Sequence, residues 1–296
     1  MFFSTFKITM KRIFRSPAML FSIPAMIIMV QQRTQNFLSA EADSFINGGY
    51  NIKVDSWYPA RYFAHIELFN AMLVPLTQCI PIIMAVILAL VIKDFYNPSE
   101  RDVLFATNIS YARYFFSKML CVFLLSVCTY LIFGISYYIF IVPQFKFGIG
   151  TWELIKIILT KMAGMGIIGI ITYMSIGVLV TALSGRAFAG SAAMVLYALI
   201  ESNMIMLRHS SDNFFWNYVY FPQMKLWPSF YMNGTQWHYG IIKYYGIKDS
   251  DMLICIVVTV VLAVISFGTA YYMFSRQRLR EKKGILGLFS KKRTEA

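Results

Sequence analysis

Long stretches without a basic or acidic residue recur along the 296-residue chain. Four hold 24 or 25 residues, and a fifth holds 21 residues with one acid inside it. About 20 apolar helical residues cross the roughly 30 Å hydrocarbon core of a bilayer. Each stretch therefore predicts a transmembrane helix. The five stretches are residues 68–92, 119–142, 162–185, 187–207 and 252–275.

A shorter apolar run covers residues 17–30. It follows a basic segment and precedes Ala40-Glu41-Ala42, so a cleaved signal peptide is an alternative interpretation. Nine residues, several of them polar, separate the run from this Ala-x-Ala sequence, which is too far for an ordinary cleavage site. We therefore expect an all-α membrane protein with six transmembrane helices, forming one domain over residues 1–296.

Residues 1–16 show helical periodicity of another kind, with an apolar face opposite a cationic face. The apolar face holds Phe2, Phe3, Phe6, Met10, Ile13 and Phe14, and the cationic face holds Lys7, Lys11, Arg12 and Arg15. Such a helix is predicted to lie in the plane of the lipid headgroups. Ser16-Pro17 then supplies an N-cap and a first-turn proline, which predicts a bend before the next helix.

Charge predicts the orientation of the chain. Only 14% of the residues are charged and 58% are hydrophobic, whereas soluble domains have about 25% charged residues. If the N-terminus is cytoplasmic, the inner segments carry 17 of the 27 Lys and Arg residues but only five of the 14 acids. This is the pattern of the positive-inside rule. We expect a multi-pass plasma-membrane protein whose termini, including the basic tail 276–296, are cytoplasmic. The net charge of +13 then reflects topology, and no nucleic-acid partner is predicted.

The predicted inner loop, residues 94–117, contains signals for a short helix. Asn97-Pro98 ends the preceding span, and Ser99 with Asp102 three residues later resembles a capping box. Asn108 and Ser110 then end the short helix. The side chains presented to the cytoplasm would be Glu100, Arg101, Val103 and Leu104. Another protein could push on such a helix, and a solvated loop is the alternative interpretation.

This order of elements resembles the membrane subunits of type-2 ABC transporters. The shared features are a basic interfacial helix ending in Arg-Ser-Pro, a span, a large outer loop, a second span and an acidic inner loop. That inner loop matches the family pattern best at Leu104, Ile109, Ser110, Arg113, Tyr114 and Lys118. Arg113 is displaced from its usual place after Ser, and Asn108 stands where the family has Pro. The resemblance covers most of the chain in layout, through a loose motif.

The resemblance implies a permease subunit that works with a separately encoded ATPase. The ATPase would hold ATP and magnesium, and this chain would hold no cofactor. The residues expected to couple the two proteins are Glu100, Arg101, Asp102, Val103, Leu104 and Arg113. A second permease subunit, identical or related, would complete the transport path, and membrane lipids would surround both. Relatives also place re-entrant helices between the fifth and sixth spans, here residues 208–251. This segment is rich in aromatic residues and contains Pro222 and Pro228, as expected for short helices that enter the bilayer only partway. A loop resting on the headgroups is the alternative interpretation.

Few polar groups fall inside the predicted spans. Glu201 is the one acid there and is predicted either to face a polar cavity or partner, or to lie near the outer interface. Together with Gln78, Trp227 and Phe230 it forms the candidate substrate path. Gly185, Ala189 and Ala193 lie at four-residue spacing, with Gly190, Ser191 and Ala192 beside them. This small-residue face allows close helix packing, either between subunits or within the chain.

The apolar path favours export of an amphipathic or hydrophobic substrate, such as a peptide toxin, an antimicrobial peptide or a drug. A lipid or glycolipid is the nearest alternative within this family. An ion-coupled transporter usually has several mid-membrane charges or repeat symmetry, and an intramembrane enzyme needs paired catalytic groups. Neither pattern is evident in the sequence. We therefore predict no catalytic residues, no metal site and no ATP hydrolysis by this chain alone, since it has no phosphate-binding loop.

Overall fold

The computed structural model describes residues 2–20, 24, 28, 80–96, 110–140, 163–206, 213–221 and 250–294. All regular structure in these residues is helical, which confirms the predicted all-α class for this part of the chain. The elements are α1 (Phe2–Phe14), α4 (Ile80–Tyr96), α6 (Tyr111–Phe140), α8 (Ala163–Ser184), α9 (Ala187–Met206), η4 (Phe215–Tyr220) and α12 (Asp251–Thr294).

Three of these helices are long and apolar enough to cross a membrane. Their apolar segments are Tyr111–Ile132, Gly166–Ser184 and Asp251–Arg276, which overlap the predicted spans 119–142, 162–185 and 252–275. α9 adds a shorter apolar stretch, Phe188–Glu201. Three of the six predicted spans are therefore present as membrane-length helices. The predicted re-entrant helices fall mostly outside the described residues.

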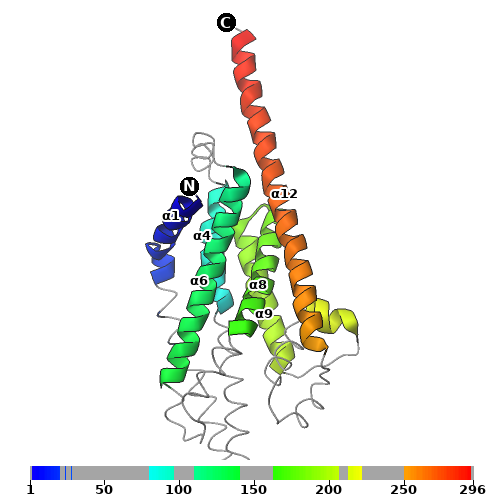
Figure 1. The fold of residues 1–296 in the computed structure, drawn as a ribbon. Helices are drawn as coiled ribbons and strands as arrows, with labels where there is room; N and C mark the ends of the chain where they lie inside the picture. The colour runs from blue at the N-terminus through cyan, green and yellow to red at the C-terminus, as the bar shows by residue number, and fades with distance from the viewer. Residues whose placement is uncertain are drawn as a thin grey trace, which may run out of the picture.

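The helices form a bundle in which α8 packs against both α9 and α12, and α4 packs against α6 and α9 (Figure 1). Large apolar side chains fill the interior, among them Ile83, Phe115, Tyr173 and Met194. Other large apolar side chains point outward on α6, α9 and α12. They include Phe116, Leu124, Leu196, Val257, Val260 and Val264. A bundle that is apolar both inside and outside is the pattern of a membrane protein, whose outer surface faces lipid.

Cations gather at one end of the bundle. The N-terminal helix α1, the start of α6 and the C-terminal part of α12 all lie at this end (Figure 1). Arg113, Arg186 and Arg276 belong to the segments that meet there. The opposite end holds η4 and Asp251, where α12 begins. We refer to the two ends as the cationic end and the η4 end.

The two longest helices extend beyond the uncharged stretches that predicted them. α6 begins at Tyr111 rather than 119, because the Ser110 hydroxyl accepts a hydrogen bond from the Arg113 backbone N–H (3.3 Å) and caps the helix. α12 continues through the basic tail to Thr294. The 18 residues after Arg276 add about 27 Å of helix at 1.5 Å per residue, and they project past the cationic end (Figure 1).

The small residues around Gly190 pack inside the chain. Gly185 has φ +69°, and its N–H bonds the Thr181 carbonyl (2.9 Å), so it forms the turn between α8 and α9. A Cβ on Gly190 would overlap the Thr181 side chain and the Gly177 carbonyl. The Ser191 hydroxyl donates to the Ala85 carbonyl on α4 (3.0 Å). The sequence left open whether these small residues pack between subunits or within the chain, and Gly190 and Ser191 pack within the chain.

The amphipathic helix α1 packs on α6 and α4. Ile13 is fully covered, and Phe6 and Met10 pack against the core, whereas Phe3 and Phe14 are exposed. Part of the predicted apolar face therefore packs against the helix bundle, and the rest is exposed on its outer surface. α1 ends where the sequence predicts an interruption, and the Ser16 carbonyl then accepts hydrogen bonds from the backbone N–H groups of Met19 and Leu20 and starts a new helical turn.

Candidate functional site

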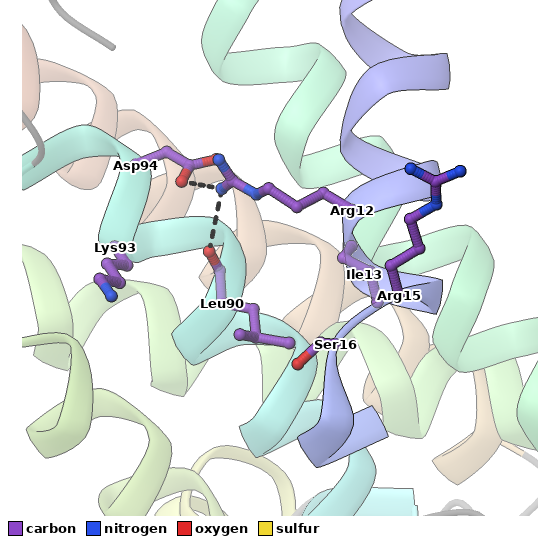
Figure 2. Close-up of a pocket in the computed structure, with 7 residues that line it drawn as sticks. All are labelled: Arg12, Ile13, Arg15, Ser16, Leu90, Lys93 and Asp94. Atoms are coloured by element: carbon purple, nitrogen blue, oxygen red, sulfur yellow. Dashed lines mark hydrogen bonds and ion pairs between the residues drawn. The ribbon is translucent and has the colours of Figure 1, made fainter. Parts of the chain in front are cut away.

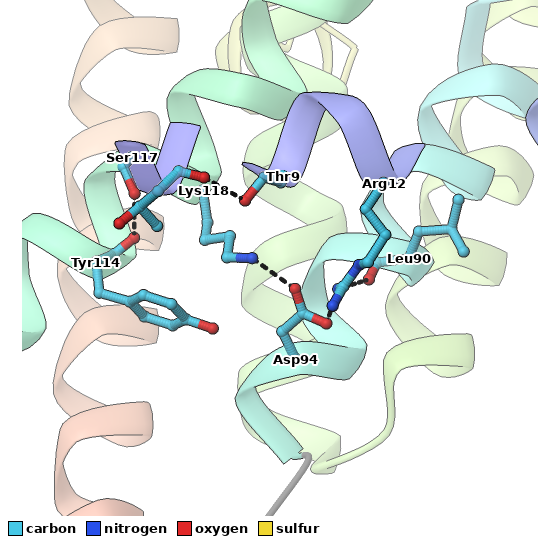
Figure 3. Close-up of polar contacts among 8 residues, drawn as sticks. Thr9, Arg12, Leu90, Asp94, Tyr114, Ser117 and Lys118 are labelled. Carbon is cyan, nitrogen blue, oxygen red and sulfur yellow. Dashed lines mark hydrogen bonds and ion pairs between the residues drawn. The ribbon is translucent and has the colours of Figure 1, made fainter. Parts of the chain in front are cut away.

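A buried carboxylate, Asp94, joins three helices near the cationic end. Its Oδ1 pairs with the Arg12 guanidinium on α1, and its Oδ2 accepts from the Lys118 ammonium on α6 at 2.5 Å (Figure 3). Arg12 also approaches the Leu90 carbonyl at 3.5 Å. We call Arg12, Asp94 and Lys118 the Asp94 cluster. Both carboxylate oxygens are used, so the cluster connects the end of α4 to α1 and α6.

Burial differs sharply within the Asp94 cluster. The side chains of Asp94 and Lys118 are 3% and 4% exposed, whereas that of Arg12 is 45% exposed. The Lys118 ammonium also lies 5.3 Å from the centroid of the Tyr114 ring, at cation–π distance. Lys118 lies about 10 Å along the helix axis from Tyr111, where α6 begins. A buried ammonium without a counter-charge would be costly, and Asp94 supplies one.

Aromatic side chains pack together around the same ends of α4 and α6. Phe95 stacks on Phe274 of α12 with a centroid distance of 5.1 Å, and it meets Tyr114 edge to face at 5.3 Å. Phe115 contacts Tyr271 at 5.6 Å. These contacts bring α12 to the ends of α4 and α6. Displacing the end of α4 would therefore disturb α1, α6 and α12 together.

A pocket of about 380 Å³ opens between α1 and α4 beside the cluster. Figure 2 shows Arg15, which follows the end of α1, and Lys93 on α4 far apart, with the Arg12–Asp94 pair between them. Its lining consists of Arg12, Ile13, Arg15, Ser16, Leu90, Lys93 and Asp94. Three of these residues are cations and one is an acid.

At the η4 end a second carboxylate, Glu201, is completely buried. The Tyr197 hydroxyl lies 3.3 Å from Glu201 Oε1 and donates to the Tyr220 carbonyl of η4 at 2.7 Å. The Tyr197 ring also stacks on Phe221 with a centroid distance of 6.2 Å. Glu201 thus lies close to η4, and its side chain is covered in this structure.

The short helix η4 is also attached to α12. The Asn213 side chain accepts from the Phe215 N–H (2.9 Å) at its start, and the Tyr218 hydroxyl donates to Asp251 Oδ1 (2.6 Å). Burial raises the pKa of Tyr218, and the hydrogen bond to the Asp251 carboxylate raises it further. Tyr218 therefore stays protonated at neutral pH, as a donor to Asp251 must. Together with Tyr197, this bond connects η4 to both α9 and α12.

Most of the predicted site residues lie outside the described part of the chain. This applies to Glu100–Leu104, including Arg101, Asp102 and Val103, and to Gln78, Trp227 and Phe230. Arg113 is described and lies exposed in the first turn of α6. The sequence reasoning did not single out Asp94. The sequence did contain a signal for it: Lys93-Asp94 directly follows one uncharged stretch, and Lys118 directly precedes the next.

Within the described residues, no group of three or more His, Cys, Asp or Glu side chains is arranged to hold a metal ion. Comparison with known proteins adds no further constraint. No protein-family model, curated protein or solved structure matches this chain.

Proposed function

We propose that this chain is the membrane subunit of an ATP-driven exporter whose ATPase is a separate protein. The observation that carries the proposal is the Asp94 cluster. Asp94 and Lys118 stand at the two ends of the predicted coupling segment, and Arg12 adds the N-terminal helix. A force applied between residues 94 and 118 would reach α1, α4 and α6 together.

The proposal includes the finer points of topology and assembly. It places both termini in the cytoplasm of a six-span plasma-membrane protein, in agreement with the cations at one end of the bundle and the positive-inside rule. It also includes a second permease subunit related by a two-fold axis. Because Gly190 and Ser191 pack within the chain, they do not support this dimer. The proposed dimer then depends on the family resemblance.

The proposed substrate is amphipathic or hydrophobic, such as a toxin or antimicrobial peptide or a drug. An apolar path supports this choice, because each unpaired polar group in hydrocarbon costs several kcal/mol. In the apolar segments of α6, α8, α9 and α12, the charged side chains are Arg113, Lys118, Glu201, Asp251 and Arg276. Of these, Lys118 lies away from a segment end and Glu201 ends the apolar stretch of α9, and both are buried in contacts within the chain.

The test is reversal of charge in the predicted coupling helix, with Glu100→Lys and Asp102→Lys combined. A matched control, Glu281→Lys with Glu295→Lys, makes the same charge change in the C-terminal tail. Tagged full-length protein is purified in mild detergent from cells that contain its ATPase partner. We expect the wild type and the control to retain the ATPase and ATP-dependent export from reconstituted vesicles. The coupling variant should lose ATPase binding or substrate-stimulated hydrolysis.

Two results would contradict the proposal. One is purified chain that transports substrate in vesicles without an ATPase. The other is a coupling variant that exports as well as the control, which would return residues 94–117 to the role of a solvated loop.

A further inference from the structure

We propose that Glu201 is a proton-binding site: it holds its proton at neutral pH and donates it to the Tyr197 hydroxyl. In this state Tyr197 keeps η4 attached to α9, and ionisation of Glu201 releases that attachment. This gives a conformational role to a residue that the sequence offered only as a substrate contact. It stands independently of the transport function proposed above, because every measurement is made on the chain alone.

The Tyr197 hydroxyl contacts two acceptors but has one hydrogen. It lies 2.7 Å from the Tyr220 carbonyl oxygen and 3.3 Å from Glu201 Oε1. The shorter contact has the typical length of an O–H···O hydrogen bond, so the hydrogen belongs to the bond with the Tyr220 carbonyl. A hydrogen between Tyr197 and Glu201 must then come from Glu201, which carries one only in its protonated form.

The surroundings of Glu201 also favour the neutral acid. The residue is completely buried, and burial disfavours a charged carboxylate. Tyrosine hydroxyls face it from two helices, Tyr197 on its own helix α9 and Tyr173 on α8. The ring of Tyr173 is fully buried and meets that of Tyr197 edge to face at 6.1 Å. Phenols are neutral at pH 7, and a protonated carboxyl can both donate to and accept from them.

The titratable groups of the neighbouring helices α6 and α4 do not change this balance. Tyr130 on α6 is buried and interacts with Tyr173, so it extends the group of neutral phenols. The charged side chains of the described part of α4 are Lys93 and Asp94, at the end of α4 that meets the cationic end of the bundle. Asp94 is paired there with two cations.

η4 and α12 contribute a carboxyl group with the opposite role. Asp251 accepts the hydrogen of the Tyr218 hydroxyl at 2.6 Å, so it acts there as a carboxylate, and the buried thiol Cys255 lies on the same helix. The η4 end therefore holds two tyrosine–carboxyl contacts. In one of them the tyrosine donates to Asp251, and in the other Glu201 donates to the tyrosine.

Ionisation of Glu201 redirects the hydrogen of Tyr197. When the Glu201 O–H bond gives its proton to water or hydroxide, Oε1 becomes a charged acceptor, which forms roughly twice as strong a hydrogen bond as a neutral one. The Tyr197 hydroxyl then donates to Glu201, and the Tyr220 carbonyl loses this donor. η4 keeps its bond to Asp251 on α12 but loses its hydrogen bond to α9. The attachment of η4 should therefore weaken as the pH rises.

Infrared spectroscopy of the full-length chain in mild detergent tests the protonation state. A protonated carboxyl gives a C=O stretch above the amide band, and an ionised carboxylate does not. The difference spectrum of wild type minus Glu201→Gln should contain this band at neutral pH. The band should shift in Tyr197→Phe, which removes its acceptor, and should stay in place in the control Asp251→Asn.

A difference spectrum without the carboxyl band would overturn the proposal, because Glu201 would then be ionised. A band at the same frequency in Tyr197→Phe would overturn it as well, because Glu201 would then donate elsewhere. Size-exclusion profiles check that each variant is folded. If Glu201→Gln fails this check, the spectrum of wild type minus Tyr197→Phe decides, since a carboxyl that donates to Tyr197 must appear in it as a shifted band.

Amide hydrogen exchange in residues 215–221 tests the release of η4. Rates are measured from about pH 6 to about pH 9, the range in which buried carboxyl groups can ionise, and each is divided by the intrinsic rate at that pH. Protection in the wild type should fall roughly fivefold as the infrared band disappears, as expected for one hydrogen bond. Glu201→Gln still offers an N–H donor to Tyr197 and cannot ionise, so its protection should stay constant.

Three results would refute the release. One is an infrared band that persists unchanged at about pH 9. Another is constant protection in the wild type while the band disappears. The third is an equal fall of protection in Glu201→Gln, which would assign the pH dependence to another group.

Discussion

Replacing Asp94 by leucine removes a carboxylate that pairs with both Arg12 and Lys118. The two cations should respond differently because their exposures differ. Arg12 is 45% exposed and can turn toward water, whereas Lys118 is 4% exposed and would remain buried after losing the Asp94 carboxylate. The loss of stability should therefore arise mainly at Lys118.

The magnitude follows from the cost of breaking a buried ion pair. Removing one partner of such a pair typically costs about 3–5 kcal/mol, so we expect this loss for Asp94→Leu. Replacing both partners by apolar residues leaves no buried charge, and Asp94→Leu with Lys118→Met should be more stable than Asp94→Leu alone. The coupling free energy of Asp94 with Lys118 should exceed about 2 kcal/mol. For the more exposed Arg12 it should be below about 1 kcal/mol.

Two double-mutant cycles measure these couplings, one with Lys118→Met and one with Arg12→Gln. Unfolding by sodium dodecyl sulfate in mixed micelles gives the free energies, with the intrinsic fluorescence of the five tryptophans as the signal. Refolding traces establish that the reaction is reversible. A coupling of Asp94 with Lys118 no larger than that with Arg12 would refute the argument that burial of the ammonium sets the cost.

Two further predictions concern the packing of α9. Gly190→Ala should lower the free energy of unfolding by about 3 kcal/mol, because the added methyl group overlaps α8. The control Gly268→Ala should not lower it, because a Cβ at that position meets nothing within 4 Å. Equal effects of the two substitutions in the same unfolding assay would show that the α8–α9 contact can relax. Tyr197→Phe should speed amide hydrogen exchange in residues 215–221 by roughly fivefold, the equivalent of about 1 kcal/mol for one hydrogen bond. The control Tyr272→Phe, at a side chain that is 58% exposed, should leave that exchange unchanged. Unchanged exchange in Tyr197→Phe would show that the Tyr197 hydroxyl does not hold η4 in place.

The hydrophobic pattern by itself determined that the described residues form helices and where three membrane-length helices lie. In a bilayer the backbone polar groups must bond within the chain, so an apolar run of 20 or more residues has few alternatives to a helix. The N-terminal helix and its interruption at Ser16 were also predictable, because an amphipathic period and a Ser-Pro pair are local signals. The start of α6 was misplaced by eight residues, since Lys118 interrupts the apolar run and is neutralised by a residue on another helix.

The tertiary structure decided which surfaces of these helices meet. α8 and α9 are apolar on all sides, so their sequences carry no period that distinguishes a packed face from an exposed one. Gly190 and Ser191 took internal roles because of the neighbours that face them, Thr181 and Ala85. The Asp94 cluster joins residues separated by 82 and 24 positions along the chain. An ion pair of this kind has no local signature, because its stability comes from burial that only the assembled helices create.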